Sequence, residues 1–545
     1  MALTHHLNAI GHHNKQRWRG IGPAPFGVFA ALVCTLPVVA LIPMALTGGG
    51  SHMGHLIDTQ LASYVSNSAA LVVITVIGTI LLGVPTAWLT TRYDFPGRKL
   101  LLVALPLSLA MPSYVSAYAW MSMTAVGGPV HDATGGLFPT VSGLLGAGFI
   151  FSISFYPYTY LLARQAFESN GTNSFEAART LGAGPWQAFR KVTLPLARPA
   201  IMAGTALVVM ETLADYGTVD FLGTPTFTVG ILRSWISFGD PEAAARLALI
   251  LLIVTLFIFG SERLVRRRSR VAELGGRNRP QHRVALSRPV ALFVCLCCAI
   301  PVLLGLVAPG LHLLTLALET QPVRSPIDAF WGTITVASLS ALVAAFLGLG
   351  AAYAARTGGW FAQASVRAAH AGYAVPGAVA ALGVIVILAA MQDLLDSVSP
   401  LAAPNIAGGG LVALLFAYQA RFAAAAIGPC ESALVRITPS MDQAARSLGA
   451  NRWAVIGRIH VPLAFSGIAT AALLVFVEVM KELPATMILR PLDFETLAVS
   501  AHHYASDERL AQAALPSLML VGLGLPIMIL VSWLVSRRQA ESSAP

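Results

Sequence analysis

Long apolar runs separated by short polar stretches recur along almost the whole chain. Many of these runs approach the roughly 20 residues that a helix needs to cross a bilayer. None of them alternates with the period of two that is typical of a membrane β-strand. Because a backbone in lipid must satisfy its own hydrogen bonds, helices are expected. The pattern predicts twelve spans, near residues 26–46, 66–90, 100–122, 141–163, 199–219, 243–262, 288–312, 330–354, 366–390, 410–428, 465–484 and 511–535.

Composition and charge placement favour a polytopic helical membrane protein. Of the 545 residues, 56% are hydrophobic and only 11% are charged, against about 25% charged in soluble domains. The basic excess does not indicate nucleic-acid binding, because lysines and arginines lie between apolar runs, as topology signals do. If both termini are cytoplasmic, the outer connections hold only six of the 35 basic residues: Arg233, Arg246, Arg324, Lys481, Arg490 and Arg509. We therefore expect both termini to be cytoplasmic.

The two halves of the chain repeat each other. Residues 176–201 and 443–468 are identical at 11 of 26 positions with a fixed offset of 267 residues. Six spans per half is an even number, so both halves have the same orientation and a pseudo-two-fold axis along the membrane normal. The predicted organisation is an N-terminal tail (1–25), a first domain (26–262), a basic linker (263–287), a second domain (288–535) and a C-terminal tail (536–545).

A cytoplasmic stretch joins the fourth and fifth spans of each half and is predicted to contain a short helix. Ser174 can cap the start of the first of these helices, and Gly182 or Gly184 can end it. A face of alanine and glycine lets another helix or a groove approach closely, so a helix displayed twice suits docking into two identical partner subunits. The alternative is an amphipathic helix that rests on the membrane, although these faces carry few large apolar residues.

Both stretches resemble the EAA loop of binding-protein-dependent ABC importer permeases. The copies read Glu176-Ala-Ala-x3-Gly182-x9-Val192-x-Leu194-Pro195 and Gln443-Ala-Ala-x3-Gly449-x9-Ile459-x-Val461-Pro462. The resemblance implies an all-α fold of two tandem six-helix domains of the type I (MetI-like) kind. It also implies that each loop couples the permease to an ATPase subunit through Glu176, Ala177, Ala178, Arg179 and Gly182 in the first copy, and Gln443, Ala444, Ala445, Arg446 and Gly449 in the second. The second copy departs from the family pattern at Gln443, where the family has an acidic residue.

The chain is expected to be a transport subunit without catalytic residues or a cofactor of its own. No lysine follows a glycine, so no phosphate-cradling loop is present. The resemblance implies that ATP and Mg²⁺ bind two copies of a separate ATPase subunit. It also implies that a periplasmic solute-binding protein delivers the substrate to a permease in the bacterial inner membrane.

Further motifs narrow the substrate. Glu211-Thr-Leu-Ala-Asp215-Tyr-Gly-Thr and Lys481-Glu-Leu-Pro-Ala-Thr-Met-Ile-Leu-Arg490-Pro are similar to stretches of ferric-iron importers with two fused halves, which implies Fe(III) as the substrate. Thiamine permeases share the fused layout and phosphonate-type permeases are relatives, so these substrates stay open. A proton-coupled secondary transporter is the alternative from another class, but it has no ATPase for the loops to dock.

Two acidic pairs predict the substrate path. Glu211 and Asp215 are four residues apart in the fifth span, and Glu478 and Glu482 repeat this spacing. Such a spacing places both members of a pair on one helical face, and charged groups at membrane depth usually face a cavity or a partner. With Tyr216 alongside, the carboxylates offer hard oxygen donors to Fe(III), with Glu211 and Glu478 as transient metal ligands.

Two alternatives concern the outer side. Lys481 and Arg490 can pair with the same carboxylates, which would then hold the outer loops together. His502 and His503 lie in a predicted outer loop and could face an incoming ligand, but adjacent residues do not readily share one helical face.

Overall fold

The computed structural model describes residues 24–46, 53–270, 283–398 and 409–543. Within these residues, eleven helices are long and apolar enough to cross a membrane, and a bent pair of helices makes up to twelve spans. The expected all-α membrane fold with about twelve spans is therefore confirmed. The predicted N-terminal tail lies outside the described residues except for its last two positions.

The described part of the first half contains thirteen α-helices. They are α2 (Ala24–Leu46), α3 (Met53–Thr59), α4 (Leu61–Arg92), α5 (Arg98–Leu107), α6 (Ser113–Thr124), α7 (Pro129–Thr134), α8 (Gly143–Ala166), α9 (Thr172–Thr180), α10 (Pro185–Ala188), α11 (Leu194–Ala214), α12 (Gly217–Phe221), α13 (Phe227–Leu232) and α14 (Pro241–Arg270). The last of these helices runs into the predicted linker 263–287, of which residues 271–282 lie outside the described part.

The second half follows the same order. Its helices are α15 (Arg288–Val302), α16 (Ala308–Glu319), α17 (Ile327–Thr357), α18 (Trp360–Ala369), α19 (Gly377–Val398), α20 (Leu411–Val435), α21 (Pro439–Ser447), α22 (Arg452–Val455), α23 (Val461–Met480), α24 (Pro484–Leu489), α25 (Leu497–Ser506) and α26 (Leu510–Ser543). The helix α26 continues through most of the predicted C-terminal tail 536–545.

The third span of each half is broken at a proline. Pro112 separates α5 from α6, which are bent by 94° relative to each other. Pro376 separates α19 from the 3-10 turn His370–Ala374 that follows α18. Proline removes a backbone donor and clashes with the preceding turn. The prediction of one continuous helix over 100–122 is therefore wrong, and the ninth span begins at Gly377 rather than near residue 366.

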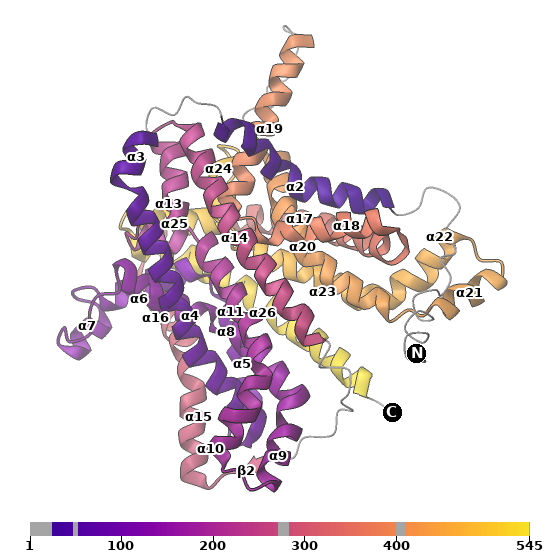
Figure 1. Cartoon of the computed structure of the whole chain (residues 1–545). Coiled ribbons are helices and arrows are strands. Elements are labelled where there is room, and N and C mark those ends of the chain that lie inside the picture. The colour runs from indigo at the N-terminus through magenta and orange to yellow at the C-terminus, as the bar shows by residue number, and fades with distance from the viewer. Residues whose placement is uncertain (1–23, 47–52, 271–282, 399–408, 544–545) are drawn as a thin grey trace.

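The first spanning helix of each half packs against the other half (Figure 1). The helix α2 contacts α17, α18, α19 and α20 of the second half, whereas α15 contacts α4 and α5, and α16 contacts α6, of the first half. Ala30 and Cys34 of α2 are buried in a cluster with Ala351 and Ala423, and such small side chains allow close helix packing in a membrane. A short parallel pairing of β1 (Tyr93–Asp94) with β2 (Val284–Ala285) adds a further link. The two halves are thus interlocked, which the sequence pattern did not indicate.

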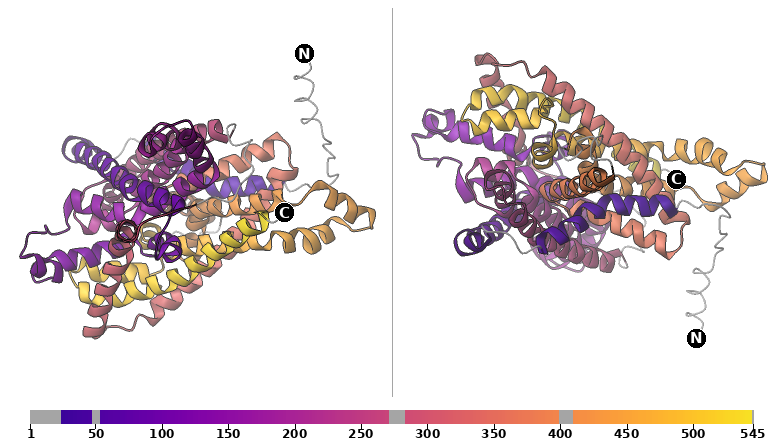
Figure 2. Two further views of the ribbon diagram at one scale, coloured as in Figure 1. Left: turned by 90° about the horizontal axis from the view of Figure 1, so that it is seen from below. Right: turned by 90° about the horizontal axis from the view of Figure 1, so that it is seen from above.

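Two arms diverge from a shared centre (Figure 1). One arm ends in α9 and α10, the other ends in α21 and α22, and the last turns of α26 lie between these ends. The views from below and above in Figure 2 show the same extended arm of α21 and α22. The helices α11 and α23 run along the arms toward the centre, so the residues at their far ends meet there.

Candidate functional site

Both predicted coupling helices form, as α9 and α21, and each packs one face against its own arm. Ala178 is 9% exposed and Ala445, at the equivalent repeat position, is 8% exposed. The other predicted contact residues are exposed at matching positions: Glu176, Ala177 and Arg179 on α9, and Gln443, Ala444 and Arg446 on α21. The two helices therefore present the same small, polar face outward.

Each coupling helix ends at a glycine whose backbone is left-handed. The φ angle is +89° at Gly182 and +82° at Gly449, a region that residues with a Cβ atom disfavour. Apart from the adjacent residues, no atom of the described residues lies within 4 Å of the position that a Cβ would take at either glycine. The turn itself therefore requires both glycines, and the close approach of a partner at these positions stays a prediction.

A leucine that sequence analysis did not single out precedes each glycine. Leu181 and Leu448 are both 88% exposed, and the first loop also exposes Trp186. One exposed leucine is ordinary on a protein surface, but the same exposure at both repeat positions gives each loop an apolar tip. The sequence Leu-Gly-Ala recurs in both loops, and this recurrence could have indicated the two leucines.

The side of the membrane on which the loops lie can be tested by labelling. Thr180 and Ser447 are exposed on the coupling helices, and Ser397 is exposed near the end of α19. We expect a membrane-impermeant thiol reagent, applied to intact cells, to label S397C but neither T180C nor S447C, because the basic residues predict cytoplasmic loops. Labelling of T180C or S447C from outside would show that this orientation is wrong.

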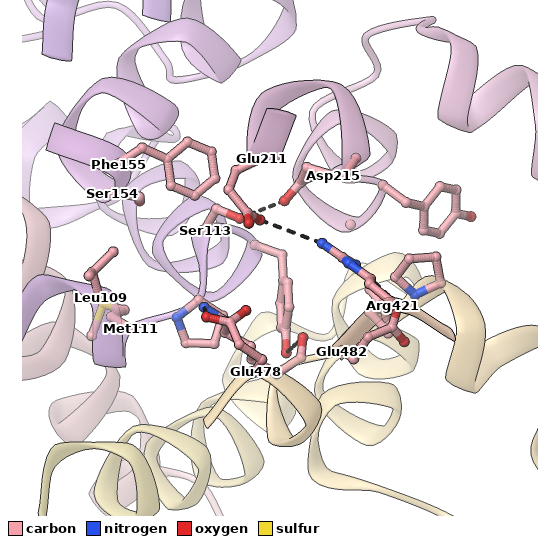
Figure 3. Close-up of a pocket in the computed structure, with 18 of the residues that line it drawn as sticks. Leu109, Met111, Ser113, Ser154, Phe155, Glu211, Asp215, Arg421, Glu478 and Glu482 are labelled. Carbon is pink, nitrogen blue, oxygen red and sulfur yellow. Dashed lines mark hydrogen bonds and ion pairs between the residues drawn. The ribbon is translucent and has the colours of Figure 1, made fainter. Parts of the chain in front are cut away.

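A cavity of about 80 Å³ lies at the centre, where α11 and α23 end (Figure 3). Space of this size admits a few water-sized groups. Residues from both halves line it, and they include all the predicted pathway residues: Glu211, Asp215, Tyr216, Glu478 and Glu482. The structure thus brings the two acidic pairs together.

Only the first member of each acidic pair lies on a spanning helix. The helix α11 ends at Ala214 and α23 ends at Met480, so the prediction of one helical face for each pair is wrong. Asp215 turns away to cap α12, where it accepts a hydrogen bond from the backbone N–H of Thr218 at 2.9 Å. A carboxylate in this position satisfies donors that the helix leaves free.

Glu482 caps α24 in the same way. It accepts hydrogen bonds from the backbone N–H groups of Ala485 at 3.1 Å and Thr486 at 3.2 Å. The proline breaks contribute to these sites, because they bring the starts of α6 and α19 to the cavity. Ser113, the first residue of α6, donates to Asp215 at 2.6 Å, and Gly377, the first residue of α19, lies directly against the Glu482 carboxylate.

A buried cation lies between the carboxylates. The guanidinium of Arg421, on α20, is 3.6 Å from Glu211 and 3.7 Å from Glu482 (Figure 3). The repeat position in the first half holds Ser154, which also lines the cavity, so the two halves differ here. Sequence analysis missed Arg421, although it is the single basic residue of the predicted span 410–428 and a charge in an apolar span indicates a functional position.

The remaining polar contacts complete the network. Lys481 lies 3.0 Å from Glu478, which confirms one of the two ion-pair alternatives considered from sequence. Arg490 instead donates to the carbonyl of Phe494 at 2.9 Å. The hydroxyl of Tyr373 donates to Glu211 at 3.1 Å.

The cavity is an ion-pair network rather than a preformed metal centre. Among the described residues, no group of three or more His, Cys, Asp and Glu side chains is placed to hold a metal ion. The role of Glu211 and Glu478 as transient ligands of a passing ion therefore stays a prediction.

His502 lies in a separate contact between the halves. Its Nδ1 atom is 2.9 Å from the Tyr118 hydroxyl, and its Nε2 atom is 3.8 Å from the Asp220 carboxylate. Burial, with a smaller effect of His503, lowers the pKa of His502 to about 4, so its ring is neutral near pH 7. His503 points elsewhere, to within 3.9 Å of Glu495. The structure thus separates the two histidines, and neither lines the cavity.

Two segments of the chain, residues 79–271 and 344–539, match the family described as the inner membrane component of binding-protein-dependent transport systems. Together they make up more than half of the chain, and each contains one coupling loop and one acidic pair. The chain belongs to this family. It is a permease with two tandem domains, and its spanning helices are those of an inner membrane component.

Three relatives differ in the substrate that their names state. The Fe(3+)-transport system permease protein FbpB 2 of Haemophilus influenzae is 26% identical over 515 residues, which cover 92% of this permease and 96% of that protein. The sulfate transport system permease protein CysT of Escherichia coli is 28% identical over 240 residues, 43% of this permease and 87% of its own length. The molybdenum transport system permease protein ModB of Escherichia coli is 32% identical over 178 residues, 31% of this permease and 77% of its own length.

Proposed function

We propose that this permease passes ferric iron, delivered by a periplasmic binding protein, across the inner membrane into the cytoplasm. Two copies of an ATPase subunit dock on α9 and α21 and drive the movement, with both termini of the permease in the cytoplasm. The observation that carries the proposal is the carboxylate-rich cavity between the two halves. It agrees with the similarity, over both halves, to a relative that is named for Fe(3+) transport.

The charges of the cavity favour a cation over an oxyanion. Four carboxylates face two cations, and both cations already contact a carboxylate: Arg421 contacts two of them and Lys481 contacts a third. Backbone N–H groups at the starts of α12 and α24 are occupied by Asp215 and Glu482. Sulfate and molybdate need such free donors and cations, so the site does not offer them what they require.

The oxygen atoms around the cavity suit Fe(III), which prefers hard ligands. The aromatic side chains of Tyr114, Tyr158 and Tyr216 line the same space as the carboxylates. A transport site must also release its ion, so binding has to be weak. A network in which the carboxylates are held by internal cations meets this requirement, because an arriving ion has to compete with Arg421 and Lys481.

The coupling loops favour ATP as the energy source over a proton gradient. Two short helices with matching exposed faces and apolar tips lie at the ends of the two arms (Figure 1). A secondary transporter has no subunit to receive them.

Uptake into liposomes tests the substrate. The permease is reconstituted with its cognate ATPase and solute-binding protein, and ATP-dependent uptake is measured for labelled ferric citrate, sulfate, molybdate, thiamine and a phosphonate. We expect uptake of iron alone. ATP-dependent uptake of one of the other solutes without iron would refute the proposed substrate while leaving the permease function intact.

A further inference from the structure

The first coupling helix is held to its arm by an ion pair and by aromatic packing. Arg92, in the last turn of α4, lies 2.7 Å from Glu176 of α9. The ring of Trp88, one turn earlier, packs against Phe167, Phe175 and Phe189 with centroid distances of 5.3, 5.3 and 5.0 Å. Apolar contacts therefore surround the ion pair on the side that faces the arm.

The second coupling helix lacks the motif acid at 443 but has an acid one position earlier. Asp442 lies in the first turn of α21, and its side chain is only 14% exposed. It contacts Arg356, in the last turn of α17, at 3.2 Å, and the Nε2 atom of His460 at 2.6 Å. The Nδ1 atom of His460 is 2.5 Å from the Tyr353 hydroxyl.

This network ties together the elements that set the position of α21. Arg356 donates to the carbonyls of Leu434 and Ile437, at the end of α20, at 2.8 and 2.9 Å. Its ion pair with Asp442 then joins α17, the end of α20 and the start of α21. His460, which is 1% exposed, closes the π-helical turn Ile456–His460 that leads into α23.

The network has no counterpart at the equivalent positions of the first loop. At the offset of 267 residues, Asp442 corresponds to Phe175 and His460 to Thr193. Phe175 packs on Trp88, and the buried hydroxyl of Thr193 has no hydrogen-bond partner among the residues that the structure describes. Each half has an arginine in the last turn of its long helix, but Arg356 corresponds to Leu89 rather than to Arg92, and its acidic partner lies one residue before the position of the motif acid.

We propose that Asp442 is the positioning residue of the second coupling helix, in place of the acid missing at 443, and that the two ATPase copies are held by inequivalent loops. The inference rests on the proposed function. Glu176 is half exposed and is backed by aromatic packing, so α9 keeps its place without the ion pair. Asp442 is mostly buried between two partners. Its replacement removes the carboxylate that both Arg356 and His460 contact.

Binding of the purified ATPase subunit to the permease in nanodiscs tests this inference. We expect two copies to bind the wild type. In D442N, one copy keeps its affinity and the other binds about tenfold more weakly or worse, because Arg356 and His460 lose the carboxylate that ties them to the start of α21. In E176Q, the change at the other loop stays within about fivefold, as for exposed ion pairs.

Three further variants separate positioning from general damage. D393N removes an exposed carboxylate from α19 and should leave both affinities unchanged. In H460Q the amide can still donate to Asp442. The ATPase copy at the second loop should therefore bind H460Q more tightly than H460A. Adding Q443E to D442N should not restore binding, because residue 443 faces outward.

Two results would overturn the inference. One is wild-type affinity for both copies in D442N and H460A. The other is equal weakening of both copies in these variants at an unchanged melting temperature. A wild-type permease that binds no ATPase subunit at all would refute the proposed function as well.

Discussion

Replacing Leu181 and Leu448 together with aspartate is expected to abolish the ATP hydrolysis that substrate-loaded binding protein stimulates in the assembled transporter. Both side chains are 88% exposed, so a charge at these positions has no effect on the internal packing of the permease. An apolar residue that fills a pocket at the centre of an interface can contribute about 2 kcal/mol to binding. Each ATPase copy docks on one loop and loses one such contact, which corresponds to an affinity about thirtyfold weaker at each copy.

A matched control is available in this chain. Leu137 is 90% exposed in the segment that follows α7, and α7 lies away from both coupling loops (Figure 1). The L137D variant should bind the ATPase as the wild type does. Normal ATPase binding and stimulation in L181D/L448D would show that the apolar tips take no part in docking.

Changing Glu211 and Glu478 together to glutamine is expected to stop iron uptake while the complex still assembles and hydrolyses ATP. The change keeps the shape of the side chains but removes two of the four carboxylates that line the cavity. Arg421 retains Glu482, whereas Lys481 loses its partner, so the cavity becomes less favourable for a cation. We expect uptake to fall at least tenfold, which corresponds to about 1.4 kcal/mol in the barrier.

The control for this variant removes the same charge elsewhere. Asp393 and Asp396 are exposed near the end of α19, and the D393N/D396N variant should transport iron at the wild-type rate. Assembly is checked by co-purification of the ATPase. If E211Q/E478Q assembles and transports iron normally, the central cavity is not the substrate path.

Features that follow from the local sequence could be predicted, and those that depend on the meeting of distant segments could not. The repeat, the spans and both coupling helices rest on patterns within a few tens of residues. The crossing of α2 onto the second half depends on packing between apolar surfaces that look alike in sequence. The ion pair of Asp442 with Arg356 could not be predicted either, because Arg356 lies on another helix.

Two errors had signals that were present in the sequence. The third span was extended through Pro112, although a proline inside an apolar run commonly breaks the helix. The prediction of one helical face for each acidic pair extends the helical period past the end of α23. Pro484 indicates instead that a new helix starts two residues after Glu482. The period of a helix holds only as far as the helix itself.

The energy source of transport tests the central claim most directly. The permease is placed in liposomes with and without its ATPase and binding protein, and iron uptake is measured with ATP or with an imposed proton gradient. A permease component of a binding-protein-dependent system takes up iron only when ATP, the ATPase and the binding protein are all present, and the proton gradient has no effect. Uptake driven by the proton gradient in liposomes that hold this chain alone would contradict the account.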